Sequence, residues 1–375
     1  MNKHLFILIT LTLQIGCKNP KSTQLSRSNT NFQNSIDSIY HSNPSTIGIM
    51  AHIEAPQKNI SWSGCVGYSD DKQAILSPDQ PAMIASSMKP YVAATILKLE
   101  EDKKLTIEDP IKDYLLVRTK NLFEKEGYDL EAIRIKHLLS HTSGIYDYLQ
   151  PEYFSMIAND KQHRWTREEQ LMLSILMGSP LAPPADTFVY TDANYLLAAE
   201  IIESIVEKPY YSAMKDLLKF NQFDFKHTWF PTLESPNPTT KNLVHQYCYG
   251  WDSYDVDPSF DLYGGGGMAT TTEELARFSN KLFSGEIITD SLILSKIFSR
   301  LDPQDGNAKS NYCLGLTETN VNGYKCYIHG GFWGTSIAYF PELKTSIAVF
   351  ILKQGNGKLK YAILESLIKQ IENNR

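Results

Sequence analysis

The stretch Ala85-Ser-Ser-Met-Lys-Pro90 decides how the rest of the chain is interpreted, because it places a hydroxyl and an amine three residues apart. Residues at this spacing are neighbours on a helix, so the Lys89 amine can reach the Ser86 oxygen. Pro90 lacks an N–H and is tolerated in the first turn of a helix, which predicts a helix that begins close to Ser86. A serine beside an amine is the arrangement of an activated nucleophile.

The S-x-x-K spacing alone is weak evidence for a catalytic serine, since it occurs four times in the chain. The other three pairs are Ser69 with Lys72, Ser212 with Lys215, and Ser366 with Lys369. The first lies in a polar stretch typical of a turn, and the other two lie in amphipathic patterns where a solvated helix face is the simpler interpretation. A catalytic role for Ser86 therefore needs support from other motifs.

The composition excludes several classes of function. The chain has 375 residues, of which 42% are hydrophobic, enough for one large domain with an insertion or for two domains. Its net charge of -6 and the lack of a basic stripe argue against a nucleic-acid partner. No cysteine pair has the C-x-x-C spacing of a metal site, and the glycine run at 264–267 does not follow a buried strand as a dinucleotide site does. We expect a monomer without metal or cofactor.

Residues 1–16 are predicted to be an export signal. Lys3 and His4 precede an apolar run that is too short to span a bilayer, and Gly16-Cys17 follows this run. The ending is similar to the cleavage site of bacterial lipoproteins, although Gln14 departs from the leucine usual there. We expect an exported protein of the bacterial cell envelope, in the periplasm or at the cell surface, held to the membrane only by a lipid on Cys17. An ordinary secretory leader is the alternative.

The remaining chain divides by its hydrophobic patterns. Residues 17–31 are polar and are predicted to form a flexible tether. Strands are expected at 46–53, 60–67, 312–317, 324–329, 335–340 and 345–352, and helices at 134–139, 167–177, 194–206, 210–220 and 359–371. Strands at both ends with helices between them imply one α/β layer, from about 32–112 and 308–375, with a mostly helical insertion at about 113–307.

Three motifs fall where the layer and the insertion would meet. The segment Phe188-Val-Tyr-Thr-Asp-Ala-Asn-Tyr195 is a loop that turns into a helix and presents Tyr190 and Asp192 on one side. The segment Tyr327-Ile-His-Gly-Gly-Phe-Trp-Gly334 ends one strand and opens the next. The glycine run Gly264-Gly-Gly-Gly267 is expected to be a loop beside the site.

Taken with Ser86 and Lys89, these motifs resemble the penicillin-recognising serine hydrolases. The branch they resemble holds class C β-lactamases, D-Ala-D-Ala carboxypeptidases, D-aminopeptidases and related esterases. His137-Leu-Leu-Ser-His-Thr-Ser-Gly144 and Leu314-Gly-Leu316 are also typical of that branch. The resemblance extends from about Phe32 to the end of the chain. It implies an α/β (α+β) fold of the β-lactamase/transpeptidase type, in which helices flank an antiparallel sheet.

The resemblance assigns a role to each catalytic candidate. Ser86 attacks the carbonyl and forms an acyl-enzyme, and Lys89 activates Ser86. Tyr190 is the general base, which requires the Lys89 charge to stabilise its phenolate, because an unperturbed tyrosine titrates near pH ~10. The backbone N–H groups of Ser86 and Phe332 form the oxyanion hole.

Two positions depart from the family pattern. Asp192 stands where many relatives have asparagine, so an amide is exchanged for a group that only accepts hydrogen bonds. His329 takes the position of the lysine in the family's K-T-G strand, and Gly330 and Gly331 leave room for substrate beside that strand. Because the charge and hydroxyl that hold a substrate carboxylate are absent, we expect weak activity on β-lactams. The predicted substrate is an ester, amide or peptide without an essential carboxylate.

Other interpretations stay open at this stage. One is a D-Ala-D-Ala carboxypeptidase or a class C-like β-lactamase, acting on a peptide or a small molecule. Another is a lipid-anchored binding or sensor protein that keeps the pocket without turnover. His137 and His141 have the spacing of a zinc pair, but Leu138 occupies the place where a metalloprotease needs glutamate, which favours a structural role.

Overall fold

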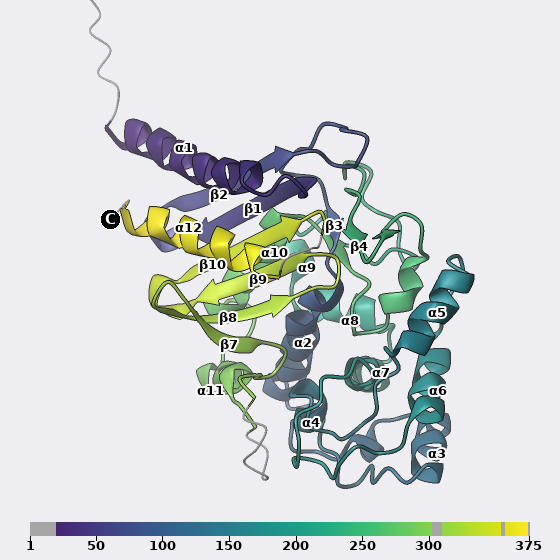
Figure 1. The fold of residues 1–375 in the computed structure, drawn as a ribbon. Helices are drawn as coiled ribbons and strands as arrows, with labels where there is room; N and C mark the ends of the chain where they lie inside the picture. The colour runs from purple at the N-terminus through teal and green to yellow at the C-terminus, as the bar shows by residue number, and fades with distance from the viewer. Residues whose placement is uncertain (1–19, 302–309, 354–356, 374–375) are drawn as a thin grey trace, which may run out of the picture.

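The structure is a computed structural model that describes residues 20–301, 310–353 and 357–373. The predicted export signal and Cys17 lie outside these residues. Six strands form one antiparallel sheet in the order β2-β1-β10-β9-β8-β7 (Figure 1). Their bounds are β1 Gly48–Ala55, β2 Ile60–Gly67, β7 Thr317–Val321, β8 Tyr324–Gly330, β9 Thr335–Phe340 and β10 Thr345–Ile351. The two ends of the chain meet where β1 pairs with β10, which confirms the prediction of an antiparallel sheet built from both ends.

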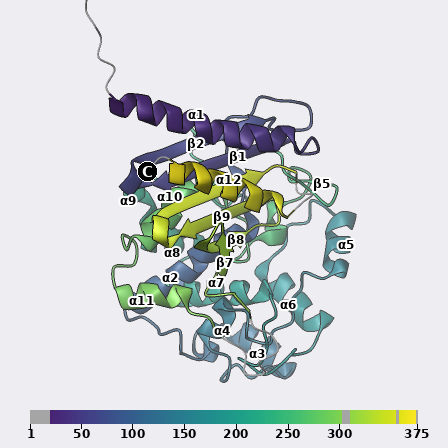
Figure 2. The same ribbon diagram turned by 60° about the vertical axis from the view of Figure 1, so that its left-hand side comes forward.

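One face of the sheet is covered by the first and last helices, α1 (Pro20–His41) and α12 (Leu359–Asn373), which lie side by side in both ribbon views (Figures 1 and 2). Phe32 from α1 and Leu367 from α12 are buried in the same cluster as Ile53 of the sheet. Each such side chain contributes about 2 kcal/mol of hydrophobic stabilisation. Helix α1 begins earlier than the sequence predicts, since residues 17–31 were expected to form a tether. Among the α1 side chains that the structure describes, the first buried apolar one is Phe32, where the apolar periodicity also starts.

The other face of the sheet packs against α10 (Thr272–Phe283), which contacts β1, β9 and β10. The Thr271 hydroxyl accepts a hydrogen bond from the Glu274 N–H and caps the helix. Helix α10 belongs to the range expected to form the insertion, yet it lies directly on the sheet. Behind it runs α2 (Lys89–Glu101), which is buried along nearly its whole length.

The remaining helices surround α2 and α7 and form the mostly helical part of the chain. They are α3 Val117–Lys125, α4 Ile135–Leu139, α5 Pro151–Asn159, α6 Arg167–Met177, α7 Ala193–Val206, α8 Tyr210–Leu217, α9 Phe220–Phe223 and α11 Ser291–Ser295. Two short ribbons pair β3 (Ala82–Met83) with β6 (Ala269–Thr270), and β4 (Tyr247–Cys248) with β5 (Trp251–Asp252). The helices predicted from periodicity agree with these bounds to within three residues.

One predicted strand, 312–317, is wrong. Tyr312 makes only an isolated bridge to Thr317, and the strand itself follows as β7. Gly315 has a φ of 79°, which turns the chain between these two residues. The apolar run that suggested a strand is therefore a buried turn.

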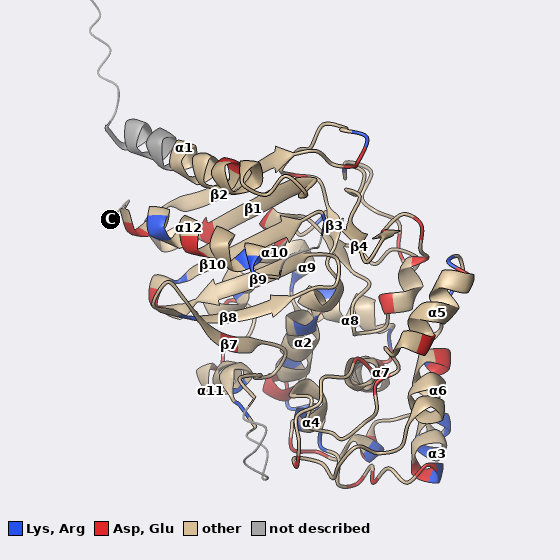
Figure 3. Ribbon diagram, in the orientation of Figure 1, with Lys and Arg blue, Asp and Glu red and all other residues tan. Residues whose placement is uncertain are grey.

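Three of the described cysteines, Cys65, Cys313 and Cys326, are free thiols. Burial raises the pKa of both Cys313 and Cys326 to about 12. Charges of both signs occur on α3 and in the first turn of α6 (Figure 3). None of the helices within the described residues combines the length and the apolar character that crossing a bilayer requires.

Candidate active site

Ser86 lies at the start of α2, as the sequence predicts. A short 3₁₀ turn, Ala85–Met88, runs directly into the helix, and Pro90 occupies its first turn. Between residues 81 and 97, Ser86 is the one residue that is not buried. Ala85 adopts the left-handed conformation with a φ of 45°, which costs about 1 kcal/mol for a residue with a side chain. This strained position directs Ser86 toward solvent.

The Lys89 ammonium is completely buried and uses all three of its N–H donors. It donates to Ser86 Oγ at 2.9 Å, to Asp192 Oδ1 at 2.6 Å and to the Gly265 carbonyl at 2.9 Å. An ammonium has three donors, so its orientation is fixed by these contacts. Asp192 is also buried and forms an ion pair with Lys89.

Tyr190 also contacts Ser86. Its hydroxyl forms a hydrogen bond with Ser86, and the Lys89 amine lies 4.9 Å from the centre of its ring. Burial and the Asp192 charge raise the pKa of Tyr190 well above its ordinary value, whereas the Ser86 hydrogen bond acts in the opposite direction. At neutral pH Tyr190 is therefore a phenol. The expected stabilisation of a phenolate by Lys89 is offset because Asp192 adds a negative charge beside it.

Two further carboxyl groups surround the Lys89 and Asp192 pair, and sequence reasoning missed both. Asp147 accepts hydrogen bonds from the Asp192 N–H at 3.0 Å and from the Thr191 hydroxyl at 3.2 Å. Burial and the Asp192 charge raise the pKa of Asp147 to about 7. The same two causes raise the pKa of Asp261 well above its usual range, and its buried Oδ2 has no partner among the described residues. The centre therefore gathers three carboxyl groups around one ammonium.

The glycine run forms the wall that holds these acids, and it is buried from Gly264 to Gly267. Besides the Gly265 carbonyl that Lys89 uses, the backbone passes very close to two carboxyl groups. A Cβ on Gly265 would lie 3.0 Å from Asp192 Oδ2, and one on Gly266 would overlap Asp261. These glycines leave space for Asp192 and Asp261.

His141 pins the loop that carries Tyr190 and Asp192. Its Nδ1 accepts the Thr191 N–H at 3.2 Å, its carbonyl accepts the Val189 N–H at 3.0 Å, and its ring lies 4.1 Å from the Tyr190 ring. His137 has a separate task, since its Nδ1 accepts the Arg134 N–H at 3.0 Å at the start of α4. Within the part of the chain that the structure describes, no group of potential ligands could hold a metal ion.

His329 lies at the end of β8 as a neutral ring. Its Nδ1 is 2.8 Å from the Gly330 carbonyl, which can only accept, so Nδ1 carries the hydrogen. Its Nε2 lies 3.0 Å from the Tyr312 hydroxyl, which is therefore the donor. Burial and the positive charge of Lys89 lower the pKa of His329 to about 3. The side chain does not supply the charge of the lysine whose position it takes.

The turn after β8 closes on the Ser86 helix. A Cβ on Gly331 would overlap the Ile84 carbonyl, so only glycine allows this approach. Thr335 secures the contact by donating from Oγ1 to the same carbonyl at 2.7 Å. Among the described residues, neither the Ser86 nor the Phe332 backbone N–H has an acceptor, which leaves both N–H groups available to a substrate oxygen.

The Phe332 side chain belongs to an aromatic wall beside the turn. Its ring stacks on Phe154 with centroids 6.1 Å apart, and it makes edge contacts with Phe260 and Trp333. Phe154 in turn contacts Trp251. This wall gives the site an apolar side.

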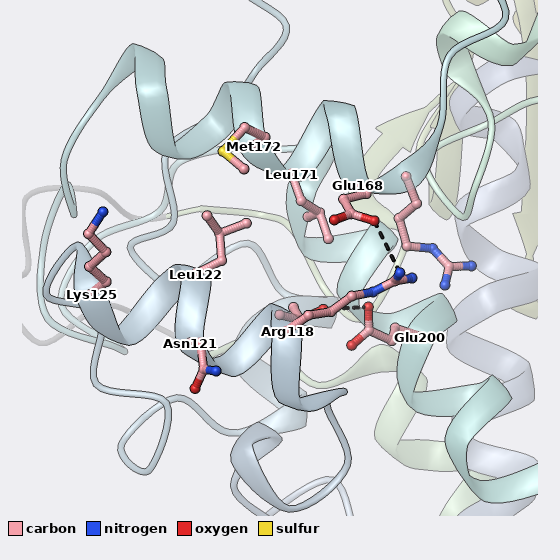
Figure 4. Close-up of a pocket in the computed structure, with 10 residues that line it drawn as sticks. Arg118, Asn121, Leu122, Lys125, Glu168, Leu171, Met172 and Glu200 are labelled. Atoms are coloured by element: carbon pink, nitrogen blue, oxygen red, sulfur yellow. Dashed lines mark hydrogen bonds and ion pairs between the residues drawn. The ribbon is translucent and has the colours of Figure 1, made fainter.

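A separate cavity of about 300 Å³ lies between α3, α6 and α7 (Figure 4). Arg118 and Glu168 form an ion pair across it at 3.1 Å, and both side chains are largely exposed. Ser86, Lys89 and Tyr190 do not line it. It is distinct from the centre described above.

The fold and the arrangement of Ser86, Lys89 and Tyr190 define a serine hydrolase of the β-lactamase/transpeptidase type. The profile of the Beta-lactamase family matches residues 51–366, and the chain belongs to this family of penicillin-recognising serine hydrolases. This result confirms the family and fold that the motifs predict.

Similar proteins come from several bacteria. Teichoic acid D-alanine hydrolase of Staphylococcus aureus is 24% identical over 319 residues, which cover 81% of this chain and 70% of that protein. D-amino acid amidase of Ochrobactrum anthropi SV3 has a TM-score of 0.77 at 20% identity, over 93% of this chain and 99% of that one. A D-stereospecific amidohydrolase of Streptomyces sp. has a TM-score of 0.74 at 20% identity, over 89% of this chain and 97% of that one. The structural likenesses establish the fold alone.

Proposed function

We propose that this protein is an exported serine hydrolase that forms an acyl-enzyme on Ser86. One observation carries the proposal: the Lys89 amine lies 2.9 Å from Ser86 Oγ, while the Tyr190 hydroxyl contacts the same residue. A serine hydroxyl becomes a nucleophile when neighbouring groups take its proton and stabilise the charge that develops.

The reaction follows from the protonation states in the site. Ser86 Oγ attacks the substrate carbonyl, and its proton passes to the Tyr190 oxygen as the phenol's own proton moves to the leaving atom. Tyr190 thus acts as general base and general acid without accumulating as a phenolate, which its raised pKa disfavours. The Ser86 and Phe332 N–H groups receive the oxyanion, and each such donor contributes a factor of about 10² to 10³. Water then attacks the acyl-enzyme by the reverse path.

The proposed substrate is a D-aminoacyl ester or amide. Relatives named as a teichoic acid D-alanine hydrolase and a D-amino acid amidase support this class. The neutral state of His329 supports weak activity on β-lactams, because no cation at that position can hold their carboxylate. The room expected beside Gly330 and Gly331 is filled by the Lys360 amine and by the Ile84 carbonyl, so these glycines do not themselves make space for the substrate.

We further propose that the mature protein is a monomer anchored at the cell envelope by a lipid on Cys17. The export pattern of residues 1–16 supports this location, as does a relative named for teichoic acid. Its net charge of -6 supports a small-molecule or peptide substrate and no nucleic-acid partner. Metabolic labelling with a fatty-acid probe, compared between the natural protein and Cys17→Ser, tests the anchor, and equal labelling would overturn it.

The activity is tested with a fluorophosphonate probe and a substrate panel. The probe should label the protein but not Ser86→Ala, and a chemically silent pocket would favour the binding or sensor protein. The panel compares D-alanyl and L-alanyl esters and amides, a D-Ala-D-Ala peptide and nitrocefin. We expect the D-alanyl ester or amide to be hydrolysed fastest. Fast nitrocefin hydrolysis, or fast release of D-alanine from the peptide, would favour the β-lactamase or carboxypeptidase instead.

A further inference from the structure

Lys360 brings a positive charge to the end of β8 from the opposite side of the sheet. It lies in the first turn of α12, and its Nζ lies 3.0 Å from the position that a Cβ on Gly330 would take. Successive residues of a strand point to opposite faces. His329 therefore faces Tyr190, while Gly330 faces α12, and only a residue without a side chain leaves this place to the lysine.

The charge of Lys360 is uncompensated in the part of the chain that the structure describes. No carboxylate in the described residues contacts its amine, and its recorded contact is the ring of Tyr361 at 5.3 Å. The side chain is half-buried, and burial alone lowers its pKa. A partly desolvated cation without a counter-charge is unfavourable, and a bound anion would relieve this cost.

Ser336 provides a second unused polar group at the same place. It pairs directly with Gly330 in the register of β8 and β9, and residues that pair directly share a face of the sheet. Its side chain is 1% exposed, and Oγ has no partner among the described residues. Buried hydroxyls are usually hydrogen-bonded, so this one is available to a ligand. The amine and the hydroxyl flank the same glycine.

Among the described strands, none pairs with this edge of β8 beyond Ile328. Strand β7 pairs with β8 only as far as Ile328, so the next two residues extend beyond it. The Tyr190 and His329 rings are 6.2 Å apart, which places this end of the strand on the side where Tyr190 delivers a proton to the leaving group. Phe332, whose N–H belongs to the proposed oxyanion hole, follows the end of β8 along the chain. A leaving group can therefore follow the open edge toward Lys360.

We propose that Lys360 and Ser336 form an anion subsite for a phosphate or carboxylate group that the leaving group of the substrate carries. The inference rests on the proposed function and specifies its leaving group as one with an acidic group on a flexible linker. The subsite faces α12, on the opposite side of the strand from His329. The carboxylate of a β-lactam is held rigidly beside the scissile bond and does not reach around the strand, whereas a chain with several rotatable bonds does.

Three D-alanyl esters that differ only in the charge of the alcohol test the subsite. They are the esters of glycerol, which is neutral, of glycerol 3-phosphate and of glyceric acid, compared by kcat/KM at low salt. The natural protein should prefer an anionic ester by about tenfold, because a charge-assisted hydrogen bond is lost with the neutral one. Lys360→Met should abolish this preference, and Lys360→Arg should retain most of it. Added salt should reduce it. The two anionic esters distinguish a phosphate from a carboxylate.

Lys369→Met is the matched control, because Lys369 is an exposed lysine of the same helix, and it should leave the preference intact. Ser336→Ala should reduce the preference in part. A preference that survives Lys360→Met, or no preference in the natural protein, would overturn the subsite.

A binding measurement separates failure of the subsite from failure of the proposed function. Glycerol 3-phosphate is titrated into Ser86→Ala protein, with and without Lys360→Met, and followed by calorimetry. Binding that Lys360→Met weakens about tenfold supports the subsite even if the natural protein hydrolyses no D-alanyl ester. Equal binding by both proteins, or none by either, refutes it whatever the hydrolysis results are.

Discussion

Replacing Asp192 by asparagine removes the carboxylate that pairs with Lys89 and leaves the side chain nearly the same shape. The two groups are 2.6 Å apart, with side chains 0% and 1% exposed. Removing one partner of such a pair costs about 3–5 kcal/mol, because the other charge stays buried without compensation. Asparagine keeps an oxygen that can accept from Lys89, so we expect a loss of about 3 kcal/mol, the lower end of this range, at pH 5.

The pH dependence of this loss follows from Asp147. In the natural protein its pKa is about 7, raised from an ordinary value of 3.8 by burial and by the Asp192 charge. The folded protein therefore binds more protons than the unfolded chain between these two values, and stability falls as the pH rises from about 4 to 7. The full shift corresponds to about 4 kcal/mol. Without the Asp192 charge, Asp147 ionises at lower pH and takes over as counter-ion to Lys89. The two proteins should therefore approach equal stability toward pH 8.

Activity should change in the opposite direction. The Asp192 charge contributes to the raised pKa of Tyr190, so its removal lowers that pKa. A change of one charge near a titrating group typically moves a pKa by about one unit or more. The proposed path uses Tyr190 as a phenol, but a phenolate that forms at alkaline pH is the stronger base and adds to the rate. The limb of the pH–rate profile that rises at alkaline pH should therefore begin about one pH unit lower in Asp192→Asn for a D-alanyl ester.

Denaturant unfolding at pH 5, 6.5 and 8, together with pH–rate profiles, measures both effects. Asp71→Asn is the control, because Asp71 is exposed and its backbone N–H donates to the Tyr247 hydroxyl, outside the group of residues around Lys89. If Asp192→Asn had the same free energy of unfolding as the natural protein at pH 5, and the same change of this free energy with pH, Asp192 would not be the counter-ion of Lys89. An unchanged pH–rate profile would contradict the link between Asp192 and Tyr190.

Three other substitutions test separate parts of the site. Lys89→Met should lower the rate at which the fluorophosphonate probe labels Ser86 about a thousandfold. Circular dichroism should show that the variant is folded. A labelling rate close to that of the natural protein would exclude an activating role for Lys89. His141→Asn removes the ring that packs against Tyr190, and asparagine tolerates the φ of 58° at this position. We expect kcat to fall about tenfold with little change in KM, because Tyr190 is less well positioned. A rise in KM alone would contradict this positioning role. Gly331→Ala places a Cβ against the Ile84 carbonyl and should lower the free energy of unfolding by about 3 kcal/mol, measured with denaturant. Gly330→Ala meets the flexible end of the Lys360 side chain and should lower it by less than about 1 kcal/mol. Equal losses for the two glycines would refute the overlap.

The sequence was sufficient for the fold because its signals are local. Alternating or continuous apolar runs mark β8, β9 and β10, and the resemblance to the family implied that they pair antiparallel. The contact between Ser86 and Lys89 was also predictable, since it depends on one helical turn. The misplaced strand at 312–317 shows the limit, because a buried turn and a short strand have the same apolar composition.

The rest of the site could not be predicted, because it is made by contacts between distant segments. Asp147 and Asp261 stand in ordinary loop sequences, and only folding brings them to Asp192. The Gly265 carbonyl is a backbone group, which no side-chain pattern reports. Lys360 lies in an amphipathic helix where a solvated position is the natural expectation, yet the register of β8 places it over Gly330.

The two departures from the family pattern act in the same electrostatic direction. Aspartate in place of the usual asparagine at 192 adds one negative charge, and neutral histidine in place of lysine at 329 removes one positive charge. The centre is thus about two charges more negative than in relatives with the usual residues. Because the Lys89 and Asp192 charges compensate each other, such a centre lacks the positive charge that attracts a carboxylate close to the scissile bond, and it accommodates the ammonium of an aminoacyl group more readily. A D-aminoacyl substrate whose acidic group is on a flexible leaving group fits both this centre and the positive charge of Lys360.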